Sequence, residues 1–120
     1  MKAVSLEPKF GSISEHWRPK VAATFNGQEI KLVKFLGEFV WHRHDETDEV
    51  FLVWRGSFRI EFRDRVVQLG PGDLCVVPRG VEHRPVAEDE VEVLLLEAAE
   101  TRNTGNVIDD RLTAPGGVPI

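Results

Sequence analysis

The sequence is poor in several residue types whose scarcity narrows the chemistry available to it. It has no tyrosine to act as a general acid, and its single cysteine, Cys75, excludes an internal disulfide and is compatible with a reducing compartment. Its longest strongly apolar run, residues 91–96, is interrupted by Glu92 and is far too short to cross a bilayer. Residues 1–10 have no apolar segment typical of a signal peptide. We therefore expect a soluble, cytoplasmic protein without a membrane partner.

Basic residues are also outnumbered. The chain has 15 Lys and Arg against 20 Asp and Glu, which gives a formal net charge of −5. Binding to a phosphate backbone or to an anionic membrane needs clustered Lys and Arg, so we expect no nucleic acid partner. A small polar ligand or a cation fits this charge better. The 120 residues suffice for one domain with one core, residues 1–120.

Short strand-like segments separated by turn residues dominate the chain. Asn26-Gly27 is a strong hairpin signal, and Gly70-Pro71-Gly72 marks a second turn. About nine strands are expected, at 21–25, 30–36, 38–44, 50–54, 57–62, 66–69, 74–77, 83–87 and 91–97. Residues 1–19 are predicted to form an N-terminal arm with a helical turn at 15–17, residues 20–100 a barrel, and residues 101–120 a C-terminal tail over the surface. This pattern predicts an all-β sandwich or barrel.

Three of the four histidines combine with one glutamate into a predicted metal site. His42 and His44 are two residues apart in a predicted strand, which places both imidazoles on one face. The acidic turn at 45–48 can return Glu49 beside them, and His83 follows a turn rich in Pro and Gly. Three imidazoles and a carboxylate suit Mn, Fe, Co, Ni or Zn. A His-x-His pair alone also occurs by chance, and His16 receives no role.

Two segments of the chain resemble the conserved motifs of the cupin family. Residues 37–56, GEFVWHRHDETDEVFLVWRG, are similar to the first motif, and residues 72–83, GDLCVVPRGVEH, are similar to the second. The 15 residues between them match the short spacing of compact microbial cupins. Two positions depart from the pattern: four residues rather than five separate Gly37 from His42, and Ala87 replaces a common Asn. Neither departure affects a ligand position.

The resemblance implies a double-stranded β-helix, or jelly-roll, barrel. In such a barrel His42, His44, Glu49 and His83 point inward and hold one divalent metal ion. The resemblance also implies a homodimer, whereas a monomer whose arm covers its own sheet is the alternative. Small cupins of this form resemble proteins described as mannose-6-phosphate isomerase-like.

The sequence is compatible with two functions. The first is a metal-dependent enzyme that oxygenates or isomerises a small oxygen-rich or sugar-like molecule. The second is a non-catalytic module that binds or senses a small ligand through its metal, and the lack of an obvious acid–base residue beyond the ligands favours it. Arg79 and Lys34 are the predicted substrate-binding residues, because either cation can serve an anionic substrate. Cys75 is interpreted as a small core residue rather than a ligand or nucleophile.

Overall fold

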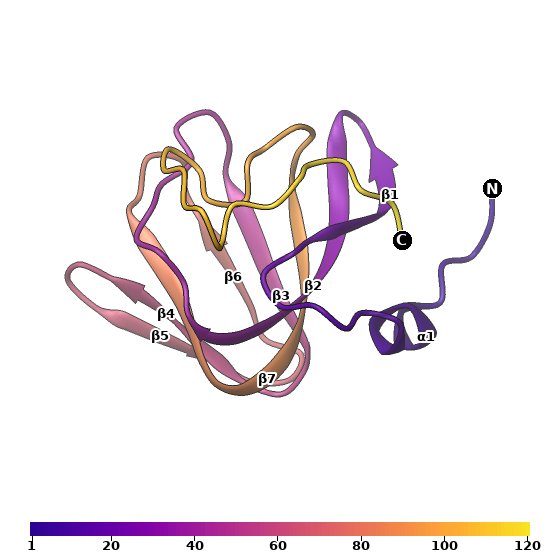
Figure 1. The fold of residues 1–120 in the computed structure, drawn as a ribbon, viewed down its shortest axis with the longest axis horizontal. Coiled ribbons are helices and arrows are strands. Elements are labelled where there is room, and N and C mark those ends of the chain that lie inside the picture. The colour runs from indigo at the N-terminus through magenta and orange to yellow at the C-terminus, as the bar shows by residue number, and fades with distance from the viewer.

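The computed structural model describes residues 1–120 and contains a barrel built from a seven-stranded antiparallel sheet (Figure 1). The elements are α1 (Leu6–Gly11), β1 (Lys20–Phe25), β2 (Gln28–Glu38), β3 (Glu49–Arg55), β4 (Phe58–Phe62), β5 (Val66–Leu69), β6 (Leu74–Val77) and β7 (His83–Ala98). The all-β, jelly-roll prediction is confirmed. No helix of the protein has the length and apolar character that crossing a bilayer requires.

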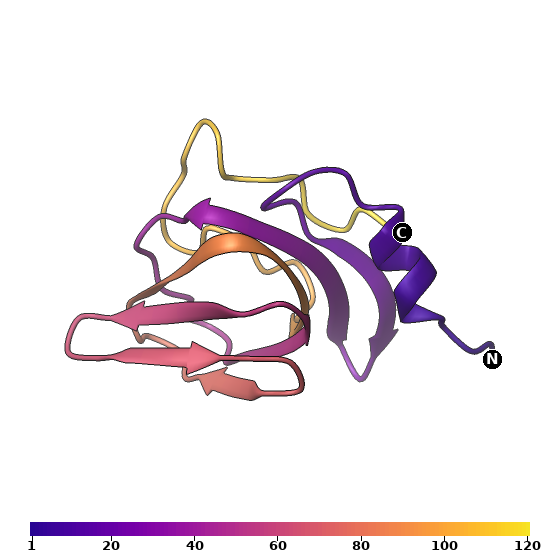
Figure 2. The ribbon, with the colours of Figure 1, turned by 90° about the horizontal axis from the view of Figure 1, so that it is seen from below.

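Strand β7 connects the two layers of the barrel. The strand order is β1-β2-β7-β3-β6, and residues 91–98 of β7 pair with β2 and in part with β3. The beginning of β7, residues 83–86, pairs with β4, and Val86 and Ala87 also pair with the end of β2. β4 pairs in turn with β5. Figure 2 shows the curvature that lets the long strands pass from one layer to the other. The end of β7 that carries His83 is thereby brought beside β4 and the segment that follows β2.

Three details of the predicted elements are wrong. The predicted strands at 83–87 and 91–97 are one 16-residue strand, β7, because the exposed polar residues 88–90 continue the strand instead of forming a turn that ends it. The pairing with β2 shifts in register at this point. The predicted strand at 38–44 is absent, since β2 ends at Glu38 and only His42 makes an isolated bridge beyond it. The helical turn lies at Leu6–Gly11 rather than at 15–17.

The barrel interior holds one apolar core, and a smaller cluster covers the outside of the sheet. Phe10 and Ile13 of the arm pack on Leu32 of β2, and half-buried Leu94 and Ile120 adjoin them. The arm therefore lies on the chain's own sheet. The end of the tail joins β1 through a hydrogen bond from the Val21 N–H to the Val118 carbonyl at 2.7 Å.

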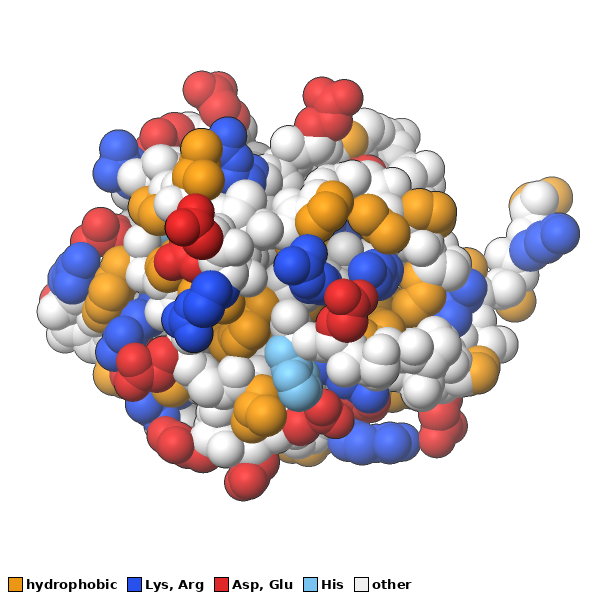
Figure 3. Space-filling model, in the orientation of Figure 1, with side chains coloured by type: hydrophobic (Ala, Val, Ile, Leu, Met, Phe, Trp, Pro, Cys, Tyr) orange, Lys and Arg blue, Asp and Glu red, His pale blue; other side chains and the backbone are white.

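The surface carries charges of both signs. On the face in Figure 3 acidic and basic side chains are interspersed without a continuous patch of one sign. This distribution agrees with the modest net charge of −5.

Candidate metal centre

The segment His42–His44 lies outside the regular strands but keeps the alternation of a strand. The His42 N–H donates to the His83 carbonyl at 3.0 Å, and the Gly80 N–H donates to the His44 carbonyl at 2.8 Å. His42 and His44 are 2% and 5% exposed, whereas Arg43 between them is exposed. The strand assignment was wrong, but its consequence holds: both imidazoles point inward.

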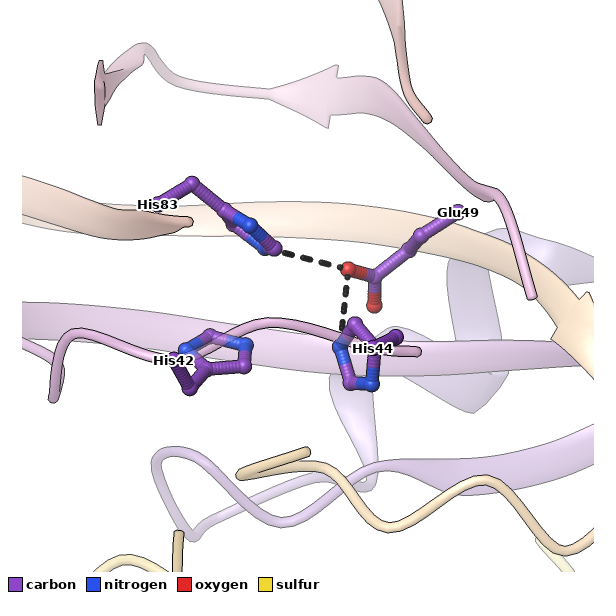
Figure 4. Close-up of side chains that lie close together, drawn as sticks. All are labelled: His42, His44, Glu49 and His83. Atoms are coloured by element: carbon purple, nitrogen blue, oxygen red, sulfur yellow. Dashed lines mark ion pairs between the residues drawn. The ribbon is translucent and has the colours of Figure 1, made fainter. Parts of the chain in front are cut away.

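The other two members of the cluster stand at strand beginnings. Glu49 is the first residue of β3 and His83 the first residue of β7. Figure 4 shows the four side chains converging, with Glu49 Oε1 3.3 Å from His44 Nε2 and 3.4 Å from His83 Nε2. One potential ligand atom from each of His42, His44, Glu49 and His83 lies within 4.8 Å of the others. The structure therefore brings the four predicted ligands together.

Backbone carbonyls orient two of the imidazoles. Nδ1 of His42 lies 2.9 Å from the Val40 carbonyl oxygen, and Nδ1 of His83 lies 2.9 Å from that of Val81. A carbonyl oxygen only accepts hydrogen bonds, so each Nδ1 carries the hydrogen and donates it. Each Nε2 then keeps its lone pair free to bind a metal, with the ring orientation fixed by the carbonyl behind it.

Burial and neighbouring charges favour the protonation states that bind a metal. Desolvation, together with the neighbouring His83, lowers the pKa of His42 from 6.5 to about 4, so this imidazole is neutral at pH 7. Burial alone would raise the pKa of Glu49, but the proximity of the His44 and His83 imidazoles outweighs that effect and lowers the pKa below its usual range. A neutral imidazole and an ionised carboxylate are the ligand forms that a divalent cation requires.

Unpartnered polar atoms provide the test of whether a metal fits. His44 Nε2, Glu49 Oε1 and His83 Nε2 are buried, and none has a partner with hydrogen-bond geometry. Leaving buried polar atoms unpaired is costly, typically about 1–3 kcal/mol each. A divalent cation among the three atoms would satisfy all of them at once. The ligand types and their three unpartnered atoms therefore fit one metal ion.

The family assignment follows from the sequence and agrees with this geometry. Residues 32–98 match the Cupin_2 family, a cupin domain. The chain belongs to the cupin family. The chain is similar to a cupin-2 domain containing protein from Shewanella frigidimarina whose crystal structure is known. The two sequences are 44% identical and the structures superpose with a TM-score of 0.79, over 80% of this chain and 94% of that one. The cupin barrel predicted from the two motifs is confirmed.

Two further relatives extend the comparison. This cupin is 30% identical to protein NMB1881 from Neisseria meningitidis, with a TM-score of 0.75, over 82% of this chain and all of that one (100%). It is 37% identical over 60 residues to the uncharacterized protein YdbB of Bacillus subtilis (strain 168), over 49% of this chain. The matched region spans about half (53%) of that curated relative's length.

A row of charged side chains, buried or half-buried, lies behind Glu49. In the register of the sheet Glu29 on β2 is opposite Glu97 on β7, and Glu97 borders Glu49 on β3. Lys31 Nζ lies 2.9 Å from Glu97 Oε1 and 3.7 Å from Glu29 Oε1. Burial and the Glu49 carboxylate raise the pKa of Glu97 well above its usual range, while Lys31 opposes that shift. A second carboxyl group, that of Glu97, thus lies behind Glu49 and is paired with Lys31.

A small cavity adjoins the cluster on its apolar side. The volume open to the centre of a water molecule in this cavity is about 20 Å³, which is room for one or two waters. His42, Glu49 and Asn103 are the polar residues of its wall, and the remainder is largely apolar. Trp17 of the arm stacks on Phe35 at 4.5 Å and completes the wall together with Asn103 of the tail. A wider, mostly polar hollow of about 510 Å³ adjoins His44, between residues 43–47 and 98–106.

Neither of the predicted substrate-binding residues lines these spaces. Arg79 is exposed, and its Nε lies 3.3 Å from Asp48 Oδ1. Lys34 lies between Glu90 and Glu92, at 3.8 Å from each carboxylate. Their role in substrate binding stays a prediction. Cys75 packs against the barrel core, and burial raises the pKa of its thiol, as suits a core residue.

Sequence reasoning did not find four residues that surround the site. Lys31 and Glu97 are 66 positions apart, and only the pairing of β2 with β7 brings them together. Trp17 and Asn103 belong to the segments expected to be an arm and a tail. The one usable signal was Trp17 itself, because a large aromatic residue is rarely left in a solvated arm.

Proposed function

We propose that this cupin binds one divalent metal ion through His42, His44, Glu49 and His83 and uses it to oxygenate a small oxygen-rich organic molecule. The observation that carries the proposal is the set of three buried, unpartnered ligand atoms beside a small apolar cavity. When bound, a redox-active metal such as iron would be held by these four side chains and would supply the means to activate dioxygen. The chain's own groups orient the ligands and exclude water.

The size and lining of the cavity favour oxygenation over isomerisation. Room for one or two waters also accommodates dioxygen. An isomerase acting on a phosphorylated sugar, as in a mannose-6-phosphate isomerase-like protein, would need a base and phosphate-binding cations near the metal. No Lys or Arg lines the cavity, and Glu49 is its only carboxylate.

Three glutamates outside the ligand cluster, Glu38, Glu61 and Glu92, are engaged elsewhere and are not free to act as a base. Glu61 is held by Arg59 and Arg84 at 2.8 Å each, and Glu38 lies 3.3 Å from Arg84. Glu92 lies beside Lys34 on the outer face of the sheet. At the small cavity, isomerisation is therefore less supported than oxygenation.

The polar hollow beside His44 supports an oxygen-rich ligand. Its lining residues include Arg43 and Arg102, the polar residues Thr47, Thr101 and Asn106, and the acidic residues Asp45, Glu46 and Glu100. Guanidinium and amide groups donate hydrogen bonds to carbonyl and carboxylate oxygens, and carboxylates accept them from hydroxyl groups. This lining agrees with a small molecule that carries several oxygens.

A binding or sensing module is the second candidate. It is supported by the same absence of an acid–base side chain from the cavity wall apart from the ligands. In that case the metal would hold a small oxygen-rich ligand without turnover.

Oxygen consumption separates the two candidates. Metal-free protein is loaded with Fe²⁺, Mn²⁺, Co²⁺, Ni²⁺ or Zn²⁺ and screened against small phenols, hydroxy acids and keto acids with an oxygen electrode. Oxygen uptake that requires Fe²⁺ and is lost in His44→Ala supports the oxygenase. Ligand affinity without oxygen uptake across the panel supports the module, and isomerisation with Mn²⁺ or Zn²⁺ would contradict both.

A further inference from the structure

The tail segment that follows β7 packs directly on the metal-binding segment. The Asn106 N–H donates to the Arg43 carbonyl at 3.0 Å, and the Arg43 N–H donates to Asn106 Oδ1 at 2.8 Å. A single tail residue thus satisfies both backbone polar groups of Arg43. Arg43 lies between the ligands His42 and His44, so these bonds act on the backbone that carries two ligands.

These contacts replace the strand that the segment lacks on one side. On its other side the segment is held by the reciprocal backbone bonds of His42 with His83 and by the Gly80 N–H on the His44 carbonyl. A single bridge of this kind is a weak constraint when no neighbouring strand continues it. Asn106 supplies the missing second edge. The ligand segment is therefore clamped between β7 and the tail.

Gly105 allows the close approach that this arrangement needs. Its φ is +56°, and a Cβ at this position would lie 2.2 Å from the Arg43 carbonyl oxygen and 3.1 Å from His42 Cδ2. Any side chain would have to push the backbone of Arg43 or the imidazole of His42 away. Residue 105 consequently has to be glycine for His42 to stay where it is.

The tail segment is itself anchored, so it can act as a support. Thr104 is fully buried, and its hydroxyl lies 2.6 Å from the Val107 carbonyl and 2.7 Å from Thr113 Oγ1. Asn103 donates from Nδ2 to the carbonyls of Trp17 and Leu112, at 3.2 and 2.8 Å. These bonds fix residues 103–106 independently of the metal ligands.

We propose that Gly105 and Asn106 are positioning residues of the metal centre: the tail holds His42 and His44 in the geometry that binds the ion. The proposal rests on the proposed metal binding at the four ligands. Outer contacts that orient metal ligands typically change metal affinity by about 10–100-fold when removed. The C-terminal segment is then part of the site and not merely a cover on the barrel.

The test compares metal affinity with the stability of the metal-free protein. Dissociation constants for Zn²⁺ and Ni²⁺ are measured by calorimetry on the wild type, Asn106→Ala, Asn106→Asp, Gly105→Ala and Gly116→Ala, and urea unfolding of each metal-free protein is measured in parallel. Asn106→Ala and Gly105→Ala are expected to weaken metal binding by about tenfold or more. Asn106→Asp keeps an oxygen that accepts from the Arg43 N–H, so it is expected to bind within about threefold of the wild type. Gly116→Ala is the matched control in the same tail, because its Cβ would contact nothing within 4 Å.

The outcomes separate this inference from the metal site itself. The visible spectrum of bound Co²⁺ reports coordination geometry, and it should change in Gly105→Ala but not in Gly116→Ala. Metal affinity within twofold of the wild type in folded Asn106→Ala, whatever its urea midpoint, would overturn the positioning role. If the wild type itself binds no metal, the proposed function fails. Should Gly105→Ala not fold, the two Asn106 variants still decide the question.

Discussion

His42 and His83 are joined by two reciprocal backbone hydrogen bonds, with N–H to carbonyl distances of 3.0 and 2.9 Å. This single bridge connects the segment of the first cupin motif to the beginning of β7. It brings the two imidazole rings together, with their centroids 4.4 Å apart. The bridge explains how ligands 41 positions apart meet without a continuous strand. The pKa of His42 is lowered first by burial and then by His83, which this bridge holds beside it.

The metal-free protein is expected to lose stability in acid through His42. In the folded chain the pKa of His42 is about 4, against 6.5 as its ordinary value, so the unfolded chain binds the proton first as the pH falls. This difference corresponds to about 3 kcal/mol of stability lost between about pH 6.5 and 4. Urea unfolding between pH 7 and 4 measures it. In His42→Gln the pH dependence over this range should be weaker by a similar amount, and an identical dependence in both proteins would contradict the assignment.

Replacement of Trp17 is expected to destabilise the barrel and enlarge the cavity. Trp17 is 7% exposed, stacks on Phe35 and Phe39, and donates from its indole N–H to the Leu36 carbonyl at 2.9 Å. Trp17→Ala should cost about 3–5 kcal/mol in urea unfolding. Trp54→Ala is the control, because Trp54 is 41% exposed and should lose much less. Equal losses in the two variants would show that Trp17 does not close the barrel.

The buried ion pair behind Glu49 gives a third prediction. Lys31 is 4% exposed and Glu97 1%, so Lys31→Met leaves a buried carboxyl group without its cation. We expect a loss of about 3 kcal/mol at pH 7. The loss should shrink as the pH falls, because protonation of Glu97 removes the uncompensated charge. Lys20→Met is the control, since its partner Glu15 is 54% exposed. A loss as small as that of the control would mean that Lys31 does not compensate the carboxylate.

The homodimer expected from the sequence stays a prediction, and β6 offers the surface for it. β6 lies at the edge of the sheet, and Leu74 and Val76 on it are 61% and 50% exposed. Two copies could pair these edges and bury the apolar side chains. Light scattering at micromolar concentration should give twice the chain mass, and Val76→Lys should reduce it to one. A monomeric wild type would contradict the dimer and favour the arm-covered monomer.

The fold class and the clustering of His42, His44, Glu49 and His83 could be predicted from the sequence because both depend on local patterns. The alternation at Glu49, Phe51 and Val53 reflects one buried face, and these three residues do point inward. The supports of the site depend on long-range pairing instead. Nothing near residue 31 reveals a partner at residue 97, and nothing in the tail indicates that Gly105 lies against Arg43. The predicted strand at 38–44 failed for the same reason, because the tail replaces a neighbouring strand there.

Metal binding by His44→Ala tests the central claim most directly, with His16→Ala as the matched control. His16 lies outside the cluster and pairs with Glu90 at 2.6 Å. The wild type and His16→Ala should bind one equivalent of Zn²⁺ or Ni²⁺ and gain thermal stability from it, because ligation stabilises the folded state. His44→Ala should bind much more weakly and gain little. One equivalent bound with unchanged affinity by His44→Ala would contradict the metal centre.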